Sequence, residues 1–212
     1  MGQAIAGSVA ASDDLQLAGT WRRGNDLDAL LAASDVLVDF SLPEATDTVV
    51  AAAVGHGIPL VCGVSGLSDT QVAALEQAST SIPIVYDRNM SQGVAVLEKL
   101  VRLVAEALPG FDAEVRETHH VHKIDAPSGT ALKLGEAIAG ARGTDPADIR
   151  YDSERRGEVP GDHEVVLASA TETLTLAHSV TTRQVFADGA LVAARWVSDK
   201  SPGMFTMHDV LE

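Results

Sequence analysis

The sequence is short of cysteine, of positive charge and of long hydrophobic runs. Cys62 is the single cysteine among 212 residues, which excludes an internal disulfide and favours a reducing compartment. Lysine and arginine total 15 against 30 aspartate and glutamate residues, a net charge of −15 that disfavours nucleic acid and anionic membranes as partners. Apolar runs stay below the roughly 18 residues of a membrane span, and the alanine-rich start has no basic leader. We therefore expect a cytoplasmic protein.

The first half of the chain alternates strand-like and helix-like segments. Short apolar runs that end in small polar residues occupy residues 34–41 and 58–65, as is typical of buried parallel strands, and a third strand is expected at residues 82–86. Apolar residues at helical spacing occupy residues 43–56 and 68–78 between them. This alternation predicts an α/β fold with a Rossmann-like, doubly wound parallel sheet.

The second half has a different pattern. We expect helices at residues 93–108 and 189–197, a strand at residues 112–118, and strands at residues 164–168 and 173–178. The last two segments alternate apolar and polar residues around a short polar turn, which indicates an antiparallel hairpin. A second, α+β domain with a mixed or antiparallel sheet is therefore expected.

The segment that starts at His119 gathers protonatable groups and an anion-binding turn. His119, His120 and His122 precede Lys123, and a Pro-Ser-Gly-Thr turn then opens a helix-like run from Leu132. Unpaired N–H groups and the positive end of the helix dipole favour a bound carboxylate at such a helix start. A lysine and a histidine add a positive charge and a proton source. The segment predicts a site for an anionic substrate that needs a proton.

Two other interpretations of these histidines stay open on the residues alone. His120 and His122 share one face of an extended segment, which is the spacing of a His-x-His metal pair. Alternatively, the histidines cap neighbouring carbonyl groups and have a structural role. We expect no metal here.

Two loops follow predicted strands at the edge where parallel sheets bind ligands. They are Gly63-Val64-Ser65-Gly66 and Asp87-Arg88-Asn89-Met90-Ser91. Glycines there let a backbone approach a cofactor closely, although ordinary turns between strand and helix use the same residues. We expect a dinucleotide-binding domain at residues 1–91 and 184–212, and a substrate-binding and oligomerisation domain at residues 92–183.

Residues 119–131 closely resemble the signature of the 4-hydroxy-tetrahydrodipicolinate reductase family, formerly called dihydrodipicolinate reductases. The matching pattern is His-His-x-x-Lys-x-Asp-Ala-Pro-Ser-Gly-Thr-Ala. The resemblance continues over nearly the whole chain, in residues 35–43, 89–94, 155–163 and 186–211.

The resemblance implies reduction of a cyclic, imine-derived dicarboxylate by NADH or NADPH, with loss of water, on the route to diaminopimelate and lysine. By the same resemblance His119 is the proton donor and Lys123 assists it and steadies negative charge. His120, Gly129 and Thr130 are implied to contact the small dicarboxylate substrate. The family also implies a homotetramer.

The cofactor side departs from the family pattern. Family members start with a strand and a glycine-rich loop that ends Gly-Arg-Met-Gly, whereas this chain starts Met-Gly-Gln-Ala-Ile and is N-terminally incomplete against that pattern. Gly63, Val64, Ser65 and Gly66 stand where many relatives have Gly-Thr-Thr-Gly, and Asp87-Arg88 replaces a pair of small residues. Asn89 and Met90 complete the expected cofactor loop.

An expected strand at residues 15–21 is followed by Arg22 and Arg23, where relatives often have an acidic residue that binds ribose. Two arginines favour a 2′-phosphate and hence NADPH, or else belong to a solvated turn.

Two explanations of the short start stay open: a sequence that begins late, or real loss of cofactor binding. The leading hypothesis is an active NAD(P)H-dependent oxidoreductase. The alternatives are a non-catalytic or cofactor-impaired relative that binds a dicarboxylate or a partner subunit and, more distantly, a metal hydrolase.

Overall fold

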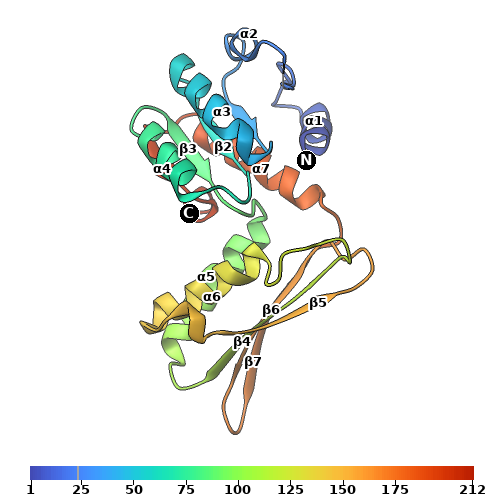
Figure 1. Cartoon of the computed structure of the whole chain (residues 1–212), viewed down its shortest axis with the longest axis vertical. Helices are drawn as coiled ribbons and strands as arrows, with labels where there is room; N and C mark the ends of the chain where they lie inside the picture. The colour runs from blue at the N-terminus through green and yellow to red at the C-terminus, as the bar shows by residue number, and fades with distance from the viewer. Residues whose placement is uncertain (23) are drawn as a thin grey trace. The chain divides into compact units, whose positions relative to one another are not determined.

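A computed structural model describes residues 1–22 and 24–212 and divides them into two compact units (Figure 1). Unit 1 comprises Met1–Ser91 and Gln184–Glu212, and unit 2 comprises Gln92–Arg183. Among the described residues, no helix is both long and apolar enough to cross a membrane.

Unit 1 is built on a parallel sheet with the strand order β1-β2-β3-β8 in its described part. The strands are β1 (Leu37–Asp39), β2 (Leu60–Cys62), β3 (Pro83–Tyr86) and β8 (Gly203–Phe205). The helices are α1 (Gly2–Ala10), α2 (Leu27–Leu31), α3 (Pro43–His56), α4 (Asp69–Ala78), α7 (Gln184–Val197) and α8 (Met207–Val210). The expected parallel α/β sheet is confirmed.

Local sequence signals set the helices of unit 1. Pro43 occupies the first turn of α3, where a missing N–H costs nothing, and Gly57 ends this helix in the left-handed conformation, with φ 67°. Ser68 and Gln71 form a reciprocal capping box at the start of α4. Side chains of α3 and α4 then pack on buried Leu60, and the sole cysteine, Cys62, is fully buried in the same core.

Several sequence predictions for unit 1 were wrong. Residues 15–21 were expected as a strand but form no regular element. A strand needs a neighbour for its backbone hydrogen bonds, and these residues instead line a pocket beside β1. The helix expected at residues 189–197 starts earlier, at Gln184, and helix α1, helix α2 and strand β8 were not expected.

Unit 2 combines a mixed sheet with two helices. Its described strands have the order β5-β4-β6-β7, with β4 parallel to β5 and antiparallel to β6, and β6 antiparallel to β7. They are β4 (Asp112–His119), β5 (Arg150–Arg155), β6 (Asp162–Ala168) and β7 (Thr173–Ser179). The helices are α5 (Gln92–Ala107) and α6 (Gly129–Arg142), with a short 3-10 turn η1 (Pro146–Asp148). The β6–β7 hairpin is as expected, whereas β5 was missed.

The two faces of this sheet have opposite character. Helices α5 and α6 lie side by side against one face (Figure 1), where Val115, Val165 and Leu167 form a buried core with Val101 and Leu134. The outer face carries ion pairs in place of a core. Arg116 lies 2.8 Å from Glu114 and 3.2 Å from Glu164, and Arg150 lies 3.0 Å from Glu114.

Candidate active site

The helix-covered face of the unit 2 sheet changes from apolar to polar at the last residues of β4. Side chains two positions apart in a strand share a face, so Glu117 and His119 follow Val115 toward the helices. In the sheet register His119 pairs with Arg155 of β5, and Glu117 pairs with His163 of β6. Three strands therefore bring ionisable side chains together at one end of a hydrophobic core.

Hydrogen bonds satisfy the buried carboxylate of this cluster. Nδ1 of His119 hydrogen-bonds to Oε2 of Glu117. The Arg155 guanidinium donates to both oxygens of Glu117, at 3.0 and 2.9 Å, and the backbone N–H of Ser128 donates to Oε1 at 3.3 Å. The Glu117 side chain has no exposed surface. An ionised carboxylate is stable here because positive and N–H donors surround it.

The electrostatic surroundings shift the pKa values of the cluster in different directions. Burial lowers the pKa of His119; the Glu117 carboxylate opposes this effect, and the positive charges of Lys123 and Arg155 add to it. Burial acts to raise the pKa of Glu117, but hydrogen bonds from Arg155 and His119 outweigh it and leave that pKa below its usual value. Burial, with smaller effects of His119 and His178, lowers the pKa of His163 to about 3. His163 is therefore neutral at physiological pH.

Nε2 of His119 lies beside a glycine. A Cβ atom on Gly161 would stand 3.0 Å from this nitrogen, and Gly161 has a φ of 154°, which side-chain-bearing residues rarely adopt. The His163 ring packs edge-on against the His119 ring, with centroids 5.2 Å apart. Because Nδ1 is bound to Glu117, Nε2 is the ring atom left for a reacting group.

The segment between β4 and α6 adds a cation and a helix start. Nζ of Lys123 lies 2.9 Å from Oδ2 of Asp125. Ser128 caps α6, its hydroxyl accepting from the N–H of Ala131 at 3.2 Å. Gly129 and Thr130 are thus the first helical residues, whose N–H groups point out of the helix end. Strand, turn and helix start follow one another as the sequence predicts.

The other two histidines of the motif differ in their surroundings. Nδ1 of His120 is buried and has no hydrogen-bond partner within residues 1–22 and 24–212. His122 is exposed, with Nε2 3.5 Å from Glu158. Their rings lie 6.1 Å apart, and no three metal-ligating side chains gather anywhere in the described part of the chain.

The expected cofactor loops of unit 1 follow β2 and β3. Gly63 packs against the Phe40 ring so closely that a Cβ atom would lie 2.4 Å from Cζ. Val64 is buried, and Ser65 is exposed before Gly66, which has a φ of 77°. A larger residue at position 63 would therefore require the Phe40 ring to shift.

The second loop is held by a buried carboxylate. Oδ1 of Asp87 accepts from the N–H of Asn89 at 3.2 Å, and Oδ2 accepts from the N–H of Met207 at 3.3 Å. Met90 is buried, and Arg88 is exposed. Asp87 therefore fixes the loop from inside unit 1. Elsewhere, Arg22 is exposed on the segment before α2, and the expected ligand Arg23 lies outside the described residues.

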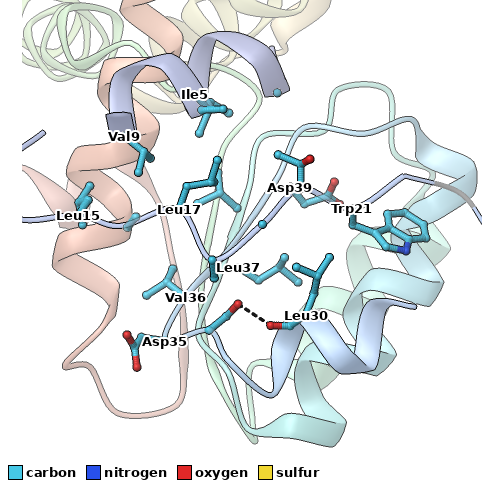
Figure 2. A pocket seen from close by; sticks show the side chains of 18 of the residues that line it. Ile5, Val9, Leu15, Leu17, Trp21, Leu30, Asp35, Val36, Leu37 and Asp39 are labelled. Atoms are coloured by element: carbon cyan, nitrogen blue, oxygen red, sulfur yellow. Dashed lines mark hydrogen bonds between the residues drawn. The ribbon is translucent and has the colours of Figure 1, made fainter. Parts of the chain in front are cut away.

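A pocket of about 1150 Å³ lies along β1 within unit 1. Residues 14–21 line it on one side and residues 33–41 on the other, and Gly2 at the start of α1 also borders it. Figure 2 shows its mostly apolar side chains, such as Ile5, Leu17 and Val36, with Asp39 among them. Asp39 is 5% exposed, and its Oδ2 has no hydrogen-bond partner among the described residues.

Comparison with known families accounts for both units. The family model "Dihydrodipicolinate reductase, N-terminus" matches residues 1–90, and the model "Dihydrodipicolinate reductase, C-terminus" matches residues 93–211. The chain belongs to the dihydrodipicolinate reductase family. The family predicted from residues 119–131 is thereby confirmed.

Named members of the dihydrodipicolinate reductase family are similar over most of this chain. A 4-hydroxy-tetrahydrodipicolinate reductase of Halorhodospira halophila is 41% identical over 206 residues, covering 89% of this chain and 77% of its own length. One of Caulobacter vibrioides is 41% identical over 238 residues, covering all of this chain and 93% of its own length.

Solved structures share the fold. The dipicolinate-bound dihydrodipicolinate reductase of Paenisporosarcina sp. TG-14 superposes with a TM-score of 0.79 at 20% identity, covering 97% of this chain and 92% of that one. A diaminopimelate dehydrogenase of C. glutamicum superposes with a TM-score of 0.63 at 13% identity, covering all of this chain and 92% of that one.

The sequence analysis did not single out three residues that complete the cluster: Glu117, Arg155 and Gly161. Glu117 had a detectable signal, because a charged residue two positions before His119 in an expected strand must share its face. Arg155 and Gly161 lie in the segment 155–163 that resembles the family, but their place beside His119 was not predicted, because strand β5 was missed.

Proposed function

We propose that this protein is an NAD(P)H-dependent oxidoreductase that reduces 4-hydroxy-tetrahydrodipicolinate to tetrahydrodipicolinate in diaminopimelate and lysine biosynthesis. Family membership and the similarity to proteins of that name support this function. The observation that carries it is the buried Glu117–His119 pair, which lies at one end of the sheet in the segment that also holds Lys123 and the start of α6. The reaction consumes one hydride and one proton and releases one water molecule.

His119 is the proposed catalytic acid. Hydride addition to a ring carbon leaves negative charge, which a proton from Nε2 of His119 neutralises. The compact positive charge of Lys123 stabilises the same negative charge. Its ion pair with Asp125 can be replaced by an ion pair with a substrate carboxylate. The free enzyme holds His119 largely neutral because burial lowers its pKa. A bound dianion close to Lys123 raises that pKa and thereby loads the acid.

The substrate carboxylates are proposed to bind at the start of α6. Gly129 and Thr130 offer N–H groups and a hydroxyl at the positive end of the helix. His120 has a buried ring nitrogen that needs a partner, which a substrate carboxylate provides when the ring is protonated there. The Paenisporosarcina reductase was solved with dipicolinate bound, and dipicolinate is a flat dicarboxylate of the proposed substrate class.

Unit 1 is the proposed dinucleotide-binding domain. Its residues fit a nicotinamide cofactor because the loop at residues 87–90 is fixed from inside unit 1, and because Asp39, which lines a large pocket, has a buried oxygen without a hydrogen-bond partner among the described residues. Gly63, Val64 and Ser65, with Asp87, Arg88, Asn89 and Met90, would hold the cofactor. Arg22, together with Arg23, would bind a 2′-phosphate and so favour NADPH over NADH. When bound, the cofactor supplies the hydride.

The test is oxidation of NADPH or NADH by the purified chain on addition of 4-hydroxy-tetrahydrodipicolinate, followed by cofactor absorbance. Substrate-dependent oxidation is the expected result. Dipicolinate binding by calorimetry without any oxidation would contradict the reductase and identify a non-catalytic dicarboxylate-binding relative.

We also propose that unit 2 assembles a homotetramer through the outer face of its sheet. In the described residues this face has no covering helix, and its side chains, such as Arg116 and Glu164, are partly exposed. Light scattering coupled to gel filtration gives the mass directly, and a monomeric mass would contradict this assembly.

A further inference from the structure

The guanidinium of Arg155 joins the buried carboxylate to the loop that follows β4. It donates to both oxygens of Glu117, and it also donates to the backbone carbonyls of Lys123 at 3.3 Å, Glu154 at 2.7 Å and Asp125 at 2.6 Å. The planar guanidinium of Arg155 thus holds the Glu117 carboxylate and the backbone beside Lys123 at fixed positions relative to each other.

Glu117 is the other half of this connection. Its oxygens receive hydrogen bonds from His119, from Arg155 and from the N–H of Ser128, which caps α6. The carboxylate therefore touches the proposed acid, the guanidinium that binds the cation-bearing loop, and the helix start. A charge without exposed surface is costly to bury, and replacing a whole buried ion pair with apolar residues is often neutral or stabilising, so stability alone does not account for this pair. The hydrogen bond between Glu117 and Nδ1 of His119 indicates that Glu117 helps to fix the orientation and the tautomer of the His119 ring.

We propose that Glu117 and Arg155 are a positioning pair that fixes the tautomer and orientation of His119 and the path of the loop at residues 120–127. This inference rests on the proposed function for its purpose, since it makes Nε2 the atom that delivers the proton. Neither residue is a catalytic residue. An ionised carboxylate only accepts hydrogen bonds, so Glu117 holds the proton on Nδ1 of His119, and neutral His119 presents Nε2 as a bare lone pair.

Charged and titratable groups from the neighbouring strands and the following loop face the His119 ring. They are Glu117 on the same strand, Arg155 on β5, His163 on β6, and Lys123 with Asp125 on the loop. Glu117 contributes the negative charge in hydrogen-bond contact, while Arg155 and Lys123 oppose protonation of the ring. Removal of the Glu117 charge therefore lowers the proton affinity of His119.

The experiment is imidazole ¹⁵N NMR of the unliganded protein through a pH titration, with His119→Gln used to assign the His119 signals. In the wild type we expect neutral His119 to carry its proton on Nδ1. In Glu117→Gln we expect that preference to disappear and the proton affinity to fall about tenfold, which is about one pH unit. Activity needs the protonated ring, so the high-pH limb of the kcat/KM profile moves to lower pH by the same amount.

The matched control is Glu114→Gln. Glu114 lies on the same strand and also accepts from two arginines, Arg116 and Arg150, but on the outer face. We expect this variant to leave both the tautomer and the titration midpoint of His119 unchanged. A wild-type tautomer and midpoint in folded Glu117→Gln would overturn the proposal.

Two further variants separate the parts of the pair. Glu117→Asp keeps the charge but shortens the side chain. We expect it to disturb the tautomer of His119 while the titration midpoint of His119 stays near that of the wild type. If Glu117→Gln fails to fold, this variant tests the proposal in its place. Arg155→Lys keeps the charge but not the planar guanidinium, so we expect the tautomer of His119 to be unchanged. The dissociation constant for dipicolinate should rise about tenfold, because the loop carbonyls lose their hydrogen bonds. Unchanged dipicolinate affinity in Arg155→Lys would contradict the loop function.

The NMR readout needs neither cofactor nor turnover. If the wild type fails to oxidise NADPH while Glu117 still sets the tautomer, the reductase proposal fails and the positioning pair stands. If the wild type is active and Glu117→Gln leaves His119 unchanged, the positioning pair fails alone.

Discussion

Glu117 of unit 2 and Asp39 of unit 1 are buried carboxylates with opposite surroundings. In unit 2 the carboxylate of Glu117 is surrounded by donors from His119, Arg155 and Ser128. In unit 1 Asp39 lines a large pocket, and its buried Oδ2 atom has no partner among the described residues. The site in unit 2 is preformed, because its residues come from one strand, the neighbouring strands and the following helix. The site in unit 1 leaves one polar atom without a partner, and a bound ligand would have to satisfy it.

The sharpest way to break this comparison is to remove the acid from the preformed site. His119→Ala is expected to lower kcat about 10²-fold or more, with a smaller effect on dicarboxylate affinity, because the proton transfer is lost while the helix start remains. Steady-state kinetics measures this effect. The control is His122→Ala, which removes an exposed imidazole of the same motif and should leave kcat as it is. An unchanged kcat in His119→Ala would remove the residue from the mechanism.

In unit 1 the comparison can be sharpened by disturbing the loop that follows β3. A Cβ atom on Gly189 of α7 would lie 1.7 Å from the carbonyl oxygen of Met90, so Gly189→Ala must shift the backbone of the loop. We expect a loss of about 1–3 kcal/mol in the free energy of unfolding and weaker cofactor binding. Urea unfolding and fluorescence titration with NADPH measure the two effects.

Gly55→Ala is the matched control, because Gly55 also lies in a helix of unit 1 and its Cβ would meet no atom within 4 Å. It should stabilise the protein by about 0.5 kcal/mol. Equal stability of the two variants would show that α7 does not pack against the loop as described.

A smaller effect is expected from the cation of the preformed site. Lys123→Ala should raise KM and lower kcat, each about tenfold, because the charge acts both on the substrate carboxylate and on the charge formed during reduction. Lys99→Ala, on the exposed side of α5, serves as control and should change neither constant. A loss confined to thermal stability would assign Lys123 a structural role through its ion pair with Asp125.

The pH dependence of stability depends on the buried ring of His163. Folding depresses the pKa of His163 from its usual 6.5 to about 3, so the unfolded state binds more protons between these values. Stability is therefore complete above pH 6.5 and falls as the pH drops toward 3, with a slope of up to about 1.4 kcal/mol per pH unit. His163→Asn should reduce the slope of the unfolding free energy between about pH 6.5 and 4.5, a window above the usual carboxylate range. An unaltered slope would mean that His163 titrates as it does in water.

The sequence predicted the elements that are contiguous in the chain. Residues 112–119, the turn and the helix from Gly129 follow one another, and local signals such as Ser128 as helix cap reveal them. The contact of Arg155 with Glu117 could not be predicted, although residues 155–163 resemble the family, because the two residues are 38 positions apart and strand β5 is mostly polar, with Tyr151 as its core contact. The strand expected at residues 15–21 failed for the opposite reason: local pattern favours it, but strands form only beside a bonding neighbour.

The central claim is that dicarboxylate binding in unit 2 loads a proton on His119. Calorimetric titration of dipicolinate into the NADPH complex at about pH 7.5, in buffers of different ionisation enthalpy, counts the protons taken up. The account predicts net uptake of up to about one proton in the wild type and its loss in His119→Gln, because burial keeps His119 neutral until a dianion arrives. Binding without proton uptake, or the same uptake in both proteins, would contradict it.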